Sequence, residues 1–340
     1  MNTKVVRLLA VAPLAAACIL FAGCKGSGGS GVINGPTPPP ASGSVYMTDS
    51  NSVLNEVLVF PQNTNGGPAP TQDISGNVTG LAQPQGIALD AAGNIWVTNS
   101  GTSTITEYPA NATGNVAPIN TIAGNATFLS SPVGNTFDKN GNMFVVNAAT
   151  DTSGFFEILE FGPSPTGNQA PISRIGGASA LLNQPQYIAV DTNGNLYVTN
   201  IASNSINIYG PGSSGNIAPI VFFGGNCQAP DGIALDASLH IYLSCDQFYE
   251  IREYSALSGT SIPTQINSLG VNASQPQLYN PSAIAVNSSG TLFVANTGLV
   301  GNAFGYITIY APGFSNATAP GAFIGGNVSN VVRPAGIALR

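Results

Sequence analysis

Short apolar runs separated by polar turns dominate the chain from residue 44 to residue 340. A representative stretch contains the runs GIALD (86–90), NIWVTN (94–99), TITEYP (104–109) and APINTIAG (117–124). Each run is rich in β-branched and aromatic residues and is bounded by Gly, Asn, Pro or Asp, which is typical of short strands joined by tight turns. We therefore expect an all-β fold, with no long helix after residue 24.

The same group of four runs repeats along the chain. Each repeat opens with a proline, and these prolines lie 45 to 53 residues apart: Pro84, Pro132, Pro185, Pro230, Pro281 and Pro334. Periods of this length are typical of propellers and solenoids, whose units bury their apolar faces only against one another. Four strands in each unit indicate the blades of a β-propeller.

The last repeat contains only one strand, PAGIALR (334–340), whereas residues 44–76 supply three strands without an opening one. We expect residues 336–340 to form the innermost strand of the blade whose other strands come from 44–76. Five complete units and this shared unit predict six four-stranded blades, closed where the C-terminal strand joins the N-terminal blade. Closure of this kind removes sheet edges that would otherwise promote aggregation.

The repeated motif resembles a known family. The pattern P-x-G-I-A-x-D-x-x-G-N-I-x-V-x-N, followed by an I-x-x-Y/F strand, is similar to the NHL repeat of six-bladed propellers and covers nearly all of residues 44–340. The fifth unit departs from it at 238–240, where SLH replaces the Gly-Asn turn. Asn287 and Arg340 stand where the other units have Asp. The basic stretch that often follows the second strand in this family is missing.

The N-terminal residues predict export and a lipid anchor. Two basic residues precede the apolar stretch 8–22, which is short for a bilayer span, so residues 1–23 resemble a secretory signal peptide. The sequence LFAGC resembles a bacterial lipobox, which implies acylation of Cys24; an ordinary signal with an inert Cys24 is the alternative. Residues 24–43 are rich in Gly, Ser and Pro and suit a tether. We expect a lipoprotein of the bacterial cell envelope, anchored in the outer membrane and facing the periplasm or the exterior.

Charge is scarce, because only 7% of the residues are charged. Loss of Lys4 and Arg7 with the signal leaves six basic residues against fifteen acidic ones. Such a chain lacks the basic surface that phosphate backbones require, so we expect no nucleic acid partner, although some NHL propellers bind RNA. We predict a monomer that reaches the membrane through its N-terminal lipid and binds a protein or glycan in the envelope.

Two cysteines, Cys227 and Cys245, fall in the fifth unit. Folding the hairpin about Leu239 brings them to the same end of neighbouring strands, so in an oxidising compartment we predict a disulfide. Two separate buried thiols are the alternative. Together with His240 they offer too few ligands for a metal site.

Candidate catalytic groups are few. Enzymes on related six-bladed propellers gather carboxylates, amides and histidines at the top of the central channel, often with a divalent metal. Here the single histidine, His240, falls in a turn on the opposite face, and no G-x-S-x-G motif, histidine cluster or carboxylate pair within a blade is evident. We predict no catalytic residues, cofactor or metal. A metal-assisted hydrolase or lyase that uses Asp231 and Asp246 at the channel mouth is the alternative function.

Three repeated positions have structural interpretations. The aspartates that end the first runs are expected to fasten tight turns rather than bind calcium: Asp90, Asp138, Asp191 and Asp236. The residues that end the second runs are expected to act in the same way at the next hairpin: Asn99, Asn147, Asn200, Asn296 and Asp49. A repeated aromatic position is expected to pack between blades: Trp96, Phe144, Tyr197, Tyr242, Phe293 and Tyr46.

The residue after each opening proline is expected at the mouth of the channel. These residues are Gln85, Val133, Gln186, Asp231, Ser282 and Ala335. Four of them are polar, and only one of these four, Asp231, is charged. This composition favours hydrogen bonding to a neutral ligand. Gln85, Gln186, Asp231 and Ser282 are therefore candidate ligand-binding residues.

Two loops between second and third strands, 148–156 and 297–306, are longer than the others. They carry Phe155, Phe156 and Phe304, which are candidates for contact with a partner; Phe248 and Tyr249 occupy the corresponding place in the fifth unit. The alternative is that these rings fold back over the blade edges. The favoured function is a lipid-anchored binding or scaffold propeller.

Overall fold

The computed structural model describes residues 43–50, 55–224, 226–270, 278–298, 304–326 and 328–340. All of these belong to one compact unit, Val32–Arg340. The predicted signal peptide and Cys24 lie outside the described residues. Within the described ranges, no helix has the length and apolar character needed to cross a membrane. The helical elements there are the 3-10 turns η1 (Asn125–Thr127), η2 (Ala178–Ala180) and η3 (Asp246–Phe248).

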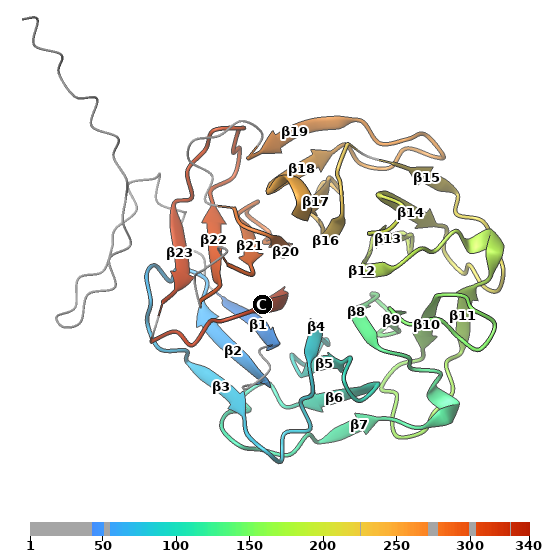
Figure 1. Ribbon diagram of the computed structural model, residues 1–340, viewed down its shortest axis with the longest axis horizontal. Coiled ribbons are helices and arrows are strands. Elements are labelled where there is room, and N and C mark those ends of the chain that lie inside the picture. Colours follow the sequence, from blue (N-terminus) through green and yellow to red (C-terminus); the bar gives the residue numbers. More distant parts are fainter. Residues whose placement is uncertain (1–42, 51–54, 225, 271–277, 299–303, 327) are drawn as a thin grey trace, which may run out of the picture. The chain divides into compact units, whose positions relative to one another are not determined.

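Six antiparallel four-stranded sheets form a ring of blades, which confirms the predicted six-bladed propeller (Figure 1). Blade 1 consists of β24 (Pro334–Leu339), β1 (Ser44–Ser50), β2 (Asn55–Pro61) and β3 (Gln72–Ser75). Blade 2 consists of β4 (Pro84–Leu89), β5 (Ile95–Asn99), β6 (Thr104–Tyr108) and β7 (Asn120–Ile122). Blade 3 consists of β8 (Pro132–Phe137), β9 (Met143–Asn147), β10 (Glu157–Phe161) and β11 (Ser173–Gly176).

The remaining blades follow the same order, from the innermost to the outermost strand. Blade 4 consists of β12 (Pro185–Val190), β13 (Leu196–Asn200), β14 (Ser205–Tyr209) and β15 (Val221–Phe223). Blade 5 consists of β16 (Pro230–Leu235), β17 (Ile241–Cys245), β18 (Glu250–Tyr254) and β19 (Gln265–Leu269). Blade 6 consists of β20 (Pro281–Val286), β21 (Leu292–Asn296), β22 (Tyr306–Tyr310) and β23 (Ala322–Gly325).

Blade 1 is closed by strands from the two ends of the propeller. β24 pairs antiparallel with β1, so that Tyr46 faces Ala338 and Asp49 faces Pro334. The Asp49 carboxylate also accepts hydrogen bonds from the backbone N–H groups of Val332 and Arg333, at 2.6 and 2.9 Å. The predicted closure by the C-terminal strand is confirmed.

The hydrophobic core lies between the blades. Each of six buried clusters joins two neighbouring blades. In one of them, Trp96 of blade 2 packs with Met143 and Phe161 of blade 3. The repeated aromatic position enters one such cluster in every blade, which confirms that it packs between blades.

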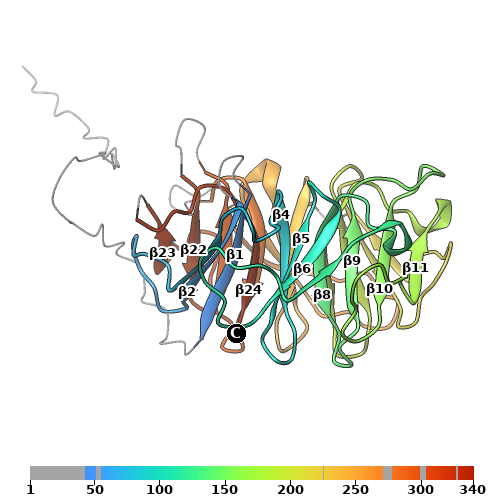
Figure 2. The ribbon, with the colours of Figure 1, turned by 90° about the horizontal axis from the view of Figure 1, so that it is seen from below.

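The propeller has two different faces (Figure 2). We call one the hairpin face, because it carries the turns between first and second strands, and the other the loop face. On the hairpin face, Asp90 Oδ1 accepts the N–H of Asn94 at 2.9 Å. The same bond recurs in the turns of blades 3, 4 and 5, so the aspartates fasten these turns as predicted.

On the loop face of blades 2, 3, 4 and 6, the asparagine that ends the second strand holds the loop that enters the same blade. Asn99 Oδ1 accepts the N–H of Ala82 at 3.0 Å, and Asn147, Asn200 and Asn296 make the equivalent bonds. These loop-anchoring hydrogen bonds differ from the expectation, which placed them in the next hairpin. The residue two positions before the opening proline has a backbone N–H group, and this group donates its hydrogen bond to the asparagine carboxamide.

Candidate functional site

A cavity of about 300 Å³ lies along the axis of the ring. All six inner strands contribute to its wall, which combines apolar side chains, such as those of Val190, Leu235 and Ile284, with the polar side chains of Asn135, Thr136 and Tyr187. Among the described residues, its lining includes no carboxylate, imidazole or thiol. Further polar groups lie at the loop-face end of the channel.

A ring of β-bulges forms that end of the channel. Each inner strand shifts register just after its opening proline; in β4 the shift falls between Pro84 and Ile87. A Cβ atom on Gly86 would lie 2.3 Å from the carbonyl oxygen of Val133 in the next blade, so only glycine allows this approach. The Thr98 hydroxyl accepts the Gly86 N–H at 2.8 Å and donates to the Val133 carbonyl at 2.5 Å.

Thr48, Thr199 and Ser244 repeat this bridge to the neighbouring blade. Their hydroxyls donate to the carbonyls of Gln85, Asp231 and Ser282. These bonds hold the backbone of the predicted mouth residues rigidly in place.

Tyr187 breaks the pattern. It stands in blade 4 where Gly86 stands in blade 2, and its hydroxyl donates to the carbonyl of Ala335 in blade 1, on the opposite side of the ring. Ala335 is available because Ala295, at the bridging position of blade 6, carries no hydroxyl. Burial and the nearby Asp231 raise the pKa of Tyr187 well above its usual range, so the hydroxyl stays protonated and donates. Tyr187 therefore spans the channel near the mouth.

The predicted mouth residues fall into two groups. Gln85, Gln186 and Asp231 are partly exposed, whereas Ser282 is buried and its hydroxyl donates to the Pro334 carbonyl at 2.9 Å. Ser282 thus links blades 6 and 1. Burial, with a smaller effect of Asp246, raises the pKa of Asp231 well above its usual range and favours the protonated carboxyl.

Four exposed aromatic side chains belong to the loop face of blades 5 and 6. Phe248, Tyr249, Tyr279 and Phe304 are 36–47% exposed, and the rings of Tyr249 and Tyr279 lie 6.1 Å apart. We call these four residues the aromatic group. Phe155 is also exposed and Phe156 is half-buried, but both belong to blade 3, across the ring from blade 6. The structure therefore separates Phe155 and Phe156 from Phe304 and adds Tyr279, which the sequence pattern did not single out.

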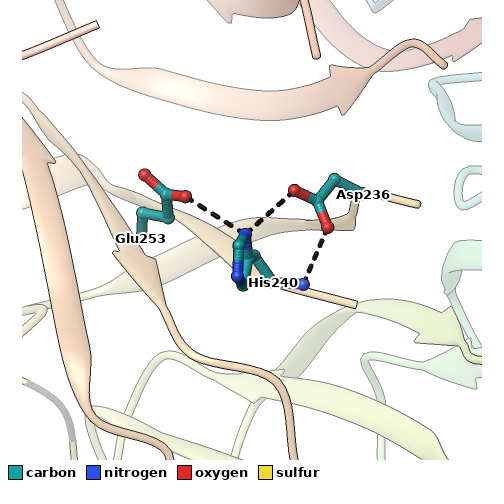
Figure 3. A group of neighbouring side chains, drawn as sticks. All are labelled: Asp236, His240 and Glu253. Atoms are coloured by element: carbon teal, nitrogen blue, oxygen red, sulfur yellow. Dashed lines mark hydrogen bonds and ion pairs between the residues drawn. The ribbon is translucent and has the colours of Figure 1, made fainter. Parts of the chain in front are cut away.

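A second polar cluster lies on the hairpin face of blade 5, where His240 stands between two carboxylates (Figure 3). Its Nδ1 atom lies 3.1 Å from Asp236 Oδ2 and 3.5 Å from Glu253 Oε1. The expectation that no blade holds a carboxylate pair was wrong, because Asp236 follows β16 and Glu253 lies in β18, and the two meet only when β16, β17 and β18 pair. The replacement of the Gly-Asn turn by SLH at 238–240 was the feature of the sequence that could have indicated this cluster.

Metal-ligating side chains converge in one place within the described residues. Three of them, Asp236, His240 and Glu253, place ligand atoms within 4.8 Å of one another. Asp231 and Asp246 of the alternative enzyme hypothesis are not joined by a third such residue in the described part of the channel mouth. Cys227 and Cys245 form a disulfide, as their places in the hairpin predict, with Cα atoms 5.1 Å apart.

Sequence comparison finds two repeat families. Residues 81–108 match the NHL repeat, and residues 172–199 match a family described as beta-propeller repeat. No curated protein matches the chain. The NHL match covers most of blade 2, where the motif is most regular.

Solved structures share the fold at low sequence identity. A protein of unknown function from Bacteroides caccae is 13% identical, with a TM-score of 0.63 over 88% of this chain and 99% of that one. A chain of a nidogen/laminin complex is 15% identical, with a TM-score of 0.57 over 88% and 98%. A functionally unknown protein from Desulfotomaculum acetoxidans DSM 771 is 13% identical, with a TM-score of 0.53 over 80% and 75%. These similarities concern the fold alone.

Proposed function

We propose that this chain, a six-bladed β-propeller that carries an NHL repeat, is a binding or scaffold module of the bacterial cell envelope whose loop face receives a protein or glycan. The aromatic group carries this proposal. Four large rings on two neighbouring blades remain exposed although the core between the blades offers apolar surroundings. Exposed aromatic clusters on a rigid scaffold are typical anchors of interfaces.

The chemistry of the mouth supports a neutral partner. Gln85 and Gln186 offer amides, and Asp231 favours its protonated form. Few charges lie on the rest of the chain, so attraction of a strongly charged partner is weak. Hydrogen bonding and ring stacking therefore dominate recognition. Acylation of Cys24, followed by the tether 24–43, would attach the propeller to a membrane surface.

A hydrolase or lyase at the channel mouth is the second candidate function. The observation in its favour is Asp231, because a carboxyl with a raised pKa is what a general acid requires. Purified protein would be assayed on a panel of lactones, glycosides and esters. Turnover that Asp231→Asn abolishes would favour this function over the binding module.

Capture in intact cells tests the binding proposal. Crosslinked partners of the native protein would be identified by mass spectrometry and compared with those of two variants. One variant carries Tyr249→Ala, Tyr279→Ala and Phe304→Ala, and the other carries Phe155→Ala and Phe156→Ala. We expect the first variant to lose the partner and the second to keep it. A glycan array with the purified proteins examines the glycan case in the same way.

Each outcome of the capture experiment either assigns the binding surface to particular residues or contradicts its assignment to the loop face. Loss with the blade 3 variant alone would move the site to Phe155 and Phe156. Retention of every partner by both variants would overturn the proposal for the loop face. Because the substituted rings are exposed or half-buried, the thermal unfolding of both variants should match that of the native protein, which serves as the control for folding.

A further inference from the structure

On the hairpin face, a bond between a turn asparagine and the turn aspartate recurs in blades 2, 3 and 4. In blade 2, Asn94 Nδ2 donates to Asp90 Oδ2 and to Glu107 Oε1, both at 3.0 Å, and Trp96 Nε1 donates to Asp90 Oδ2 at 3.1 Å. The amide carries two hydrogens and the indole carries one. Three hydrogens therefore serve three contacts, and both carboxylates are satisfied.

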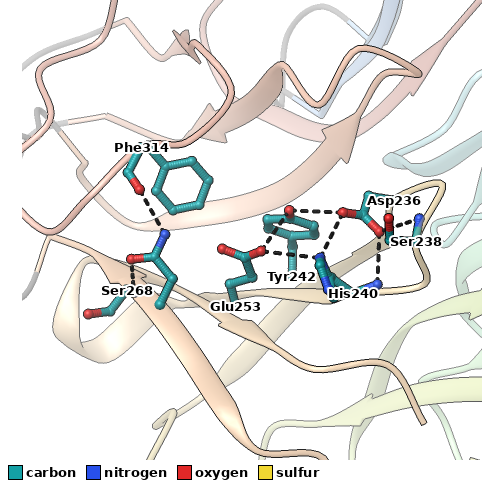
Figure 4. Close-up of polar contacts among 8 residues, drawn as sticks. Asp236, Ser238, His240, Tyr242, Glu253, Ser268 and Phe314 are labelled. Carbon is teal, nitrogen blue, oxygen red and sulfur yellow. Dashed lines mark hydrogen bonds and ion pairs between the residues drawn. The ribbon is translucent and has the colours of Figure 1, made fainter.

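Blade 5 keeps the two carboxylates but changes both donors. His240 replaces the asparagine, and Tyr242 replaces the tryptophan. The Tyr242 hydroxyl lies 3.2 Å from Asp236 Oδ2 and 3.0 Å from Glu253 Oε1, so each donor now lies between the two carboxylates (Figure 4). Imidazole Nδ1 and a phenol each carry at most one hydrogen. His240 and Tyr242 thus supply at most two hydrogens for four contacts with the carboxylate oxygens. Two of these contacts therefore have no hydrogen between the two electronegative atoms.

A metal ion would account for the two contacts of Nδ1. Zinc bound by imidazole and carboxylate has bonds of about 2.0–2.2 Å, which correspond to a separation of roughly 3.3–3.6 Å between neighbouring ligand atoms of a tetrahedron. The separations of Nδ1 from the two carboxylate oxygens, 3.1 and 3.5 Å, are close to this value. We propose that Asp236, His240 and Glu253 form a binding site for a divalent transition-metal ion, best matched by Zn²⁺.

The surroundings hold the three ligands in position. Asp236 uses its other oxygen, Oδ1, to accept the N–H groups of Ser238 and His240, each at 2.8 Å, so the hairpin fixes its carboxylate. The Tyr242 hydroxyl lies within hydrogen-bonding distance of both carboxylates and can donate its one hydrogen to either of them. Such outer hydrogen bonds orient metal ligands and are typical of built sites.

Exposure leaves room for further ligands. The His240 side chain is 35% exposed, whereas those of Asp236 and Glu253 are 15% and 13% exposed. Water can therefore complete the coordination from the solvent side, as in zinc sites with three protein ligands. Binding would displace the Nδ1 proton to solvent, so affinity should fall in acid. The site lies on the hairpin face and is separate from the proposed partner surface.

Titration of purified, chelator-treated protein with Zn²⁺ tests the site. We expect one ion per chain in isothermal titration calorimetry. Replacement of the imidazole by the amide of blade 2, in His240→Asn, should weaken binding by at least about tenfold because one of three ligands is lost. Glu107→Gln, which changes the equivalent carboxylate of blade 2, should leave binding unchanged. The protein must carry no histidine tag.

The chain offers a direct spectroscopic readout, because His240 is its only histidine. A single imidazole signal in ¹⁵N NMR should shift at Nδ1 on addition of Zn²⁺. A gain-of-site variant, Asn94→His, should raise the stoichiometry from one ion to two. Absence of binding to the native protein, or binding with equal affinity in His240→Asn, would overturn the proposal.

Discussion

Cys227 is disulfide-bonded to Cys245 at the point where the other blades use a loop-anchoring hydrogen bond. Cys245 ends β17 and faces Pro230, as Asn99 ends β5 and faces Pro84. Cys227 stands three residues before its opening proline, at a position that is leucine or valine in every other blade. Blade 5 therefore secures its entering loop covalently instead of through a carboxamide.

Exchange of the disulfide for the residues of the other blades gives the first prediction. Cys245→Ala should lower the free energy of unfolding by about 3 kcal/mol, the usual effect of opening a loop of this length. The double variant Cys227→Leu with Cys245→Asn should recover the greater part of that loss, because it restores the apolar contact and the hydrogen bond. Urea unfolding without reductant measures both. Equal stabilities of the two variants would contradict the equivalence of the positions.

Loss of the Tyr187 hydroxyl gives the second prediction. Tyr187→Phe should lower the free energy of unfolding by about 1 kcal/mol, since the bond across the channel to Ala335 is lost. Hydrogen exchange should accelerate at the backbone amides of β24, because Ala335 lies in that strand. It should stay unchanged in β8, because the Tyr187 hydroxyl makes no hydrogen bond to β8. A uniform change in both strands would argue for general destabilisation instead.

The third prediction concerns pH. Burial, with Asp73 and Asp49 nearby, raises the pKa of Glu56 from 4.5 to about 8. The unfolded chain therefore ionises Glu56 at lower pH than the folded chain does, so stability is highest below about pH 4.5 and falls as the pH rises to 8. Glu56→Gln should match the native protein at pH 5 and exceed it at pH 9 by about 1–2 kcal/mol, allowing for solvent screening.

Paired unfolding curves at the two pH values check this prediction. Other buried carboxyls, such as Glu107, also have a raised pKa and contribute to the pH dependence of both proteins. Only the difference between variant and native protein reports on Glu56. A difference that stays constant from pH 5 to pH 9 would show that Glu56 ionises equally in both states.

Removal of the closing strand gives the fourth prediction. Deletion of residues 334–340 should lower the free energy of unfolding far more than a typical point mutation does, which lowers it by about 1 kcal/mol. The Tm should fall accordingly. The deletion exposes the edge of β1 and part of the cluster that contains Val45 and Phe60. Differential scanning calorimetry measures the shift, with Arg340→Ala as the control. An unchanged melting curve would refute closure.

The sequence predicts the fold well because the fold repeats. The opening prolines, the turn aspartates and the aromatic position recur in nearly every unit, so each inference is tested several times along the chain. Local chemistry fixes these positions: Asp90, for example, binds the backbone of its own turn. The incomplete last repeat then determines the closure and the number of blades.

Candidate sites depend on exceptions to the repeat, and their effects are not local. Tyr187 in place of glycine could be noticed in the sequence, yet its partner in blade 1 follows only from the ring geometry. His240 in place of a turn asparagine could also be noticed, but Glu253 joins it through strand pairing. Phe155 and Phe304 occupy equivalent loops and were grouped together, although the ring places them on opposite sides.

The pairing of β1 with β24 also bears on folding. β1 begins at Ser44, and the strand that covers its edge begins at Pro334, after all the other blades. A chain that folds from its N-terminus can complete blades 2 to 6 in order, but β1 keeps an unpaired edge until β24 pairs with it. Unpaired edges recruit strands from other chains. The innermost part of blade 1 is thus the segment most exposed to misassembly before β24 pairs with β1, and the one a chaperone would have most reason to cover.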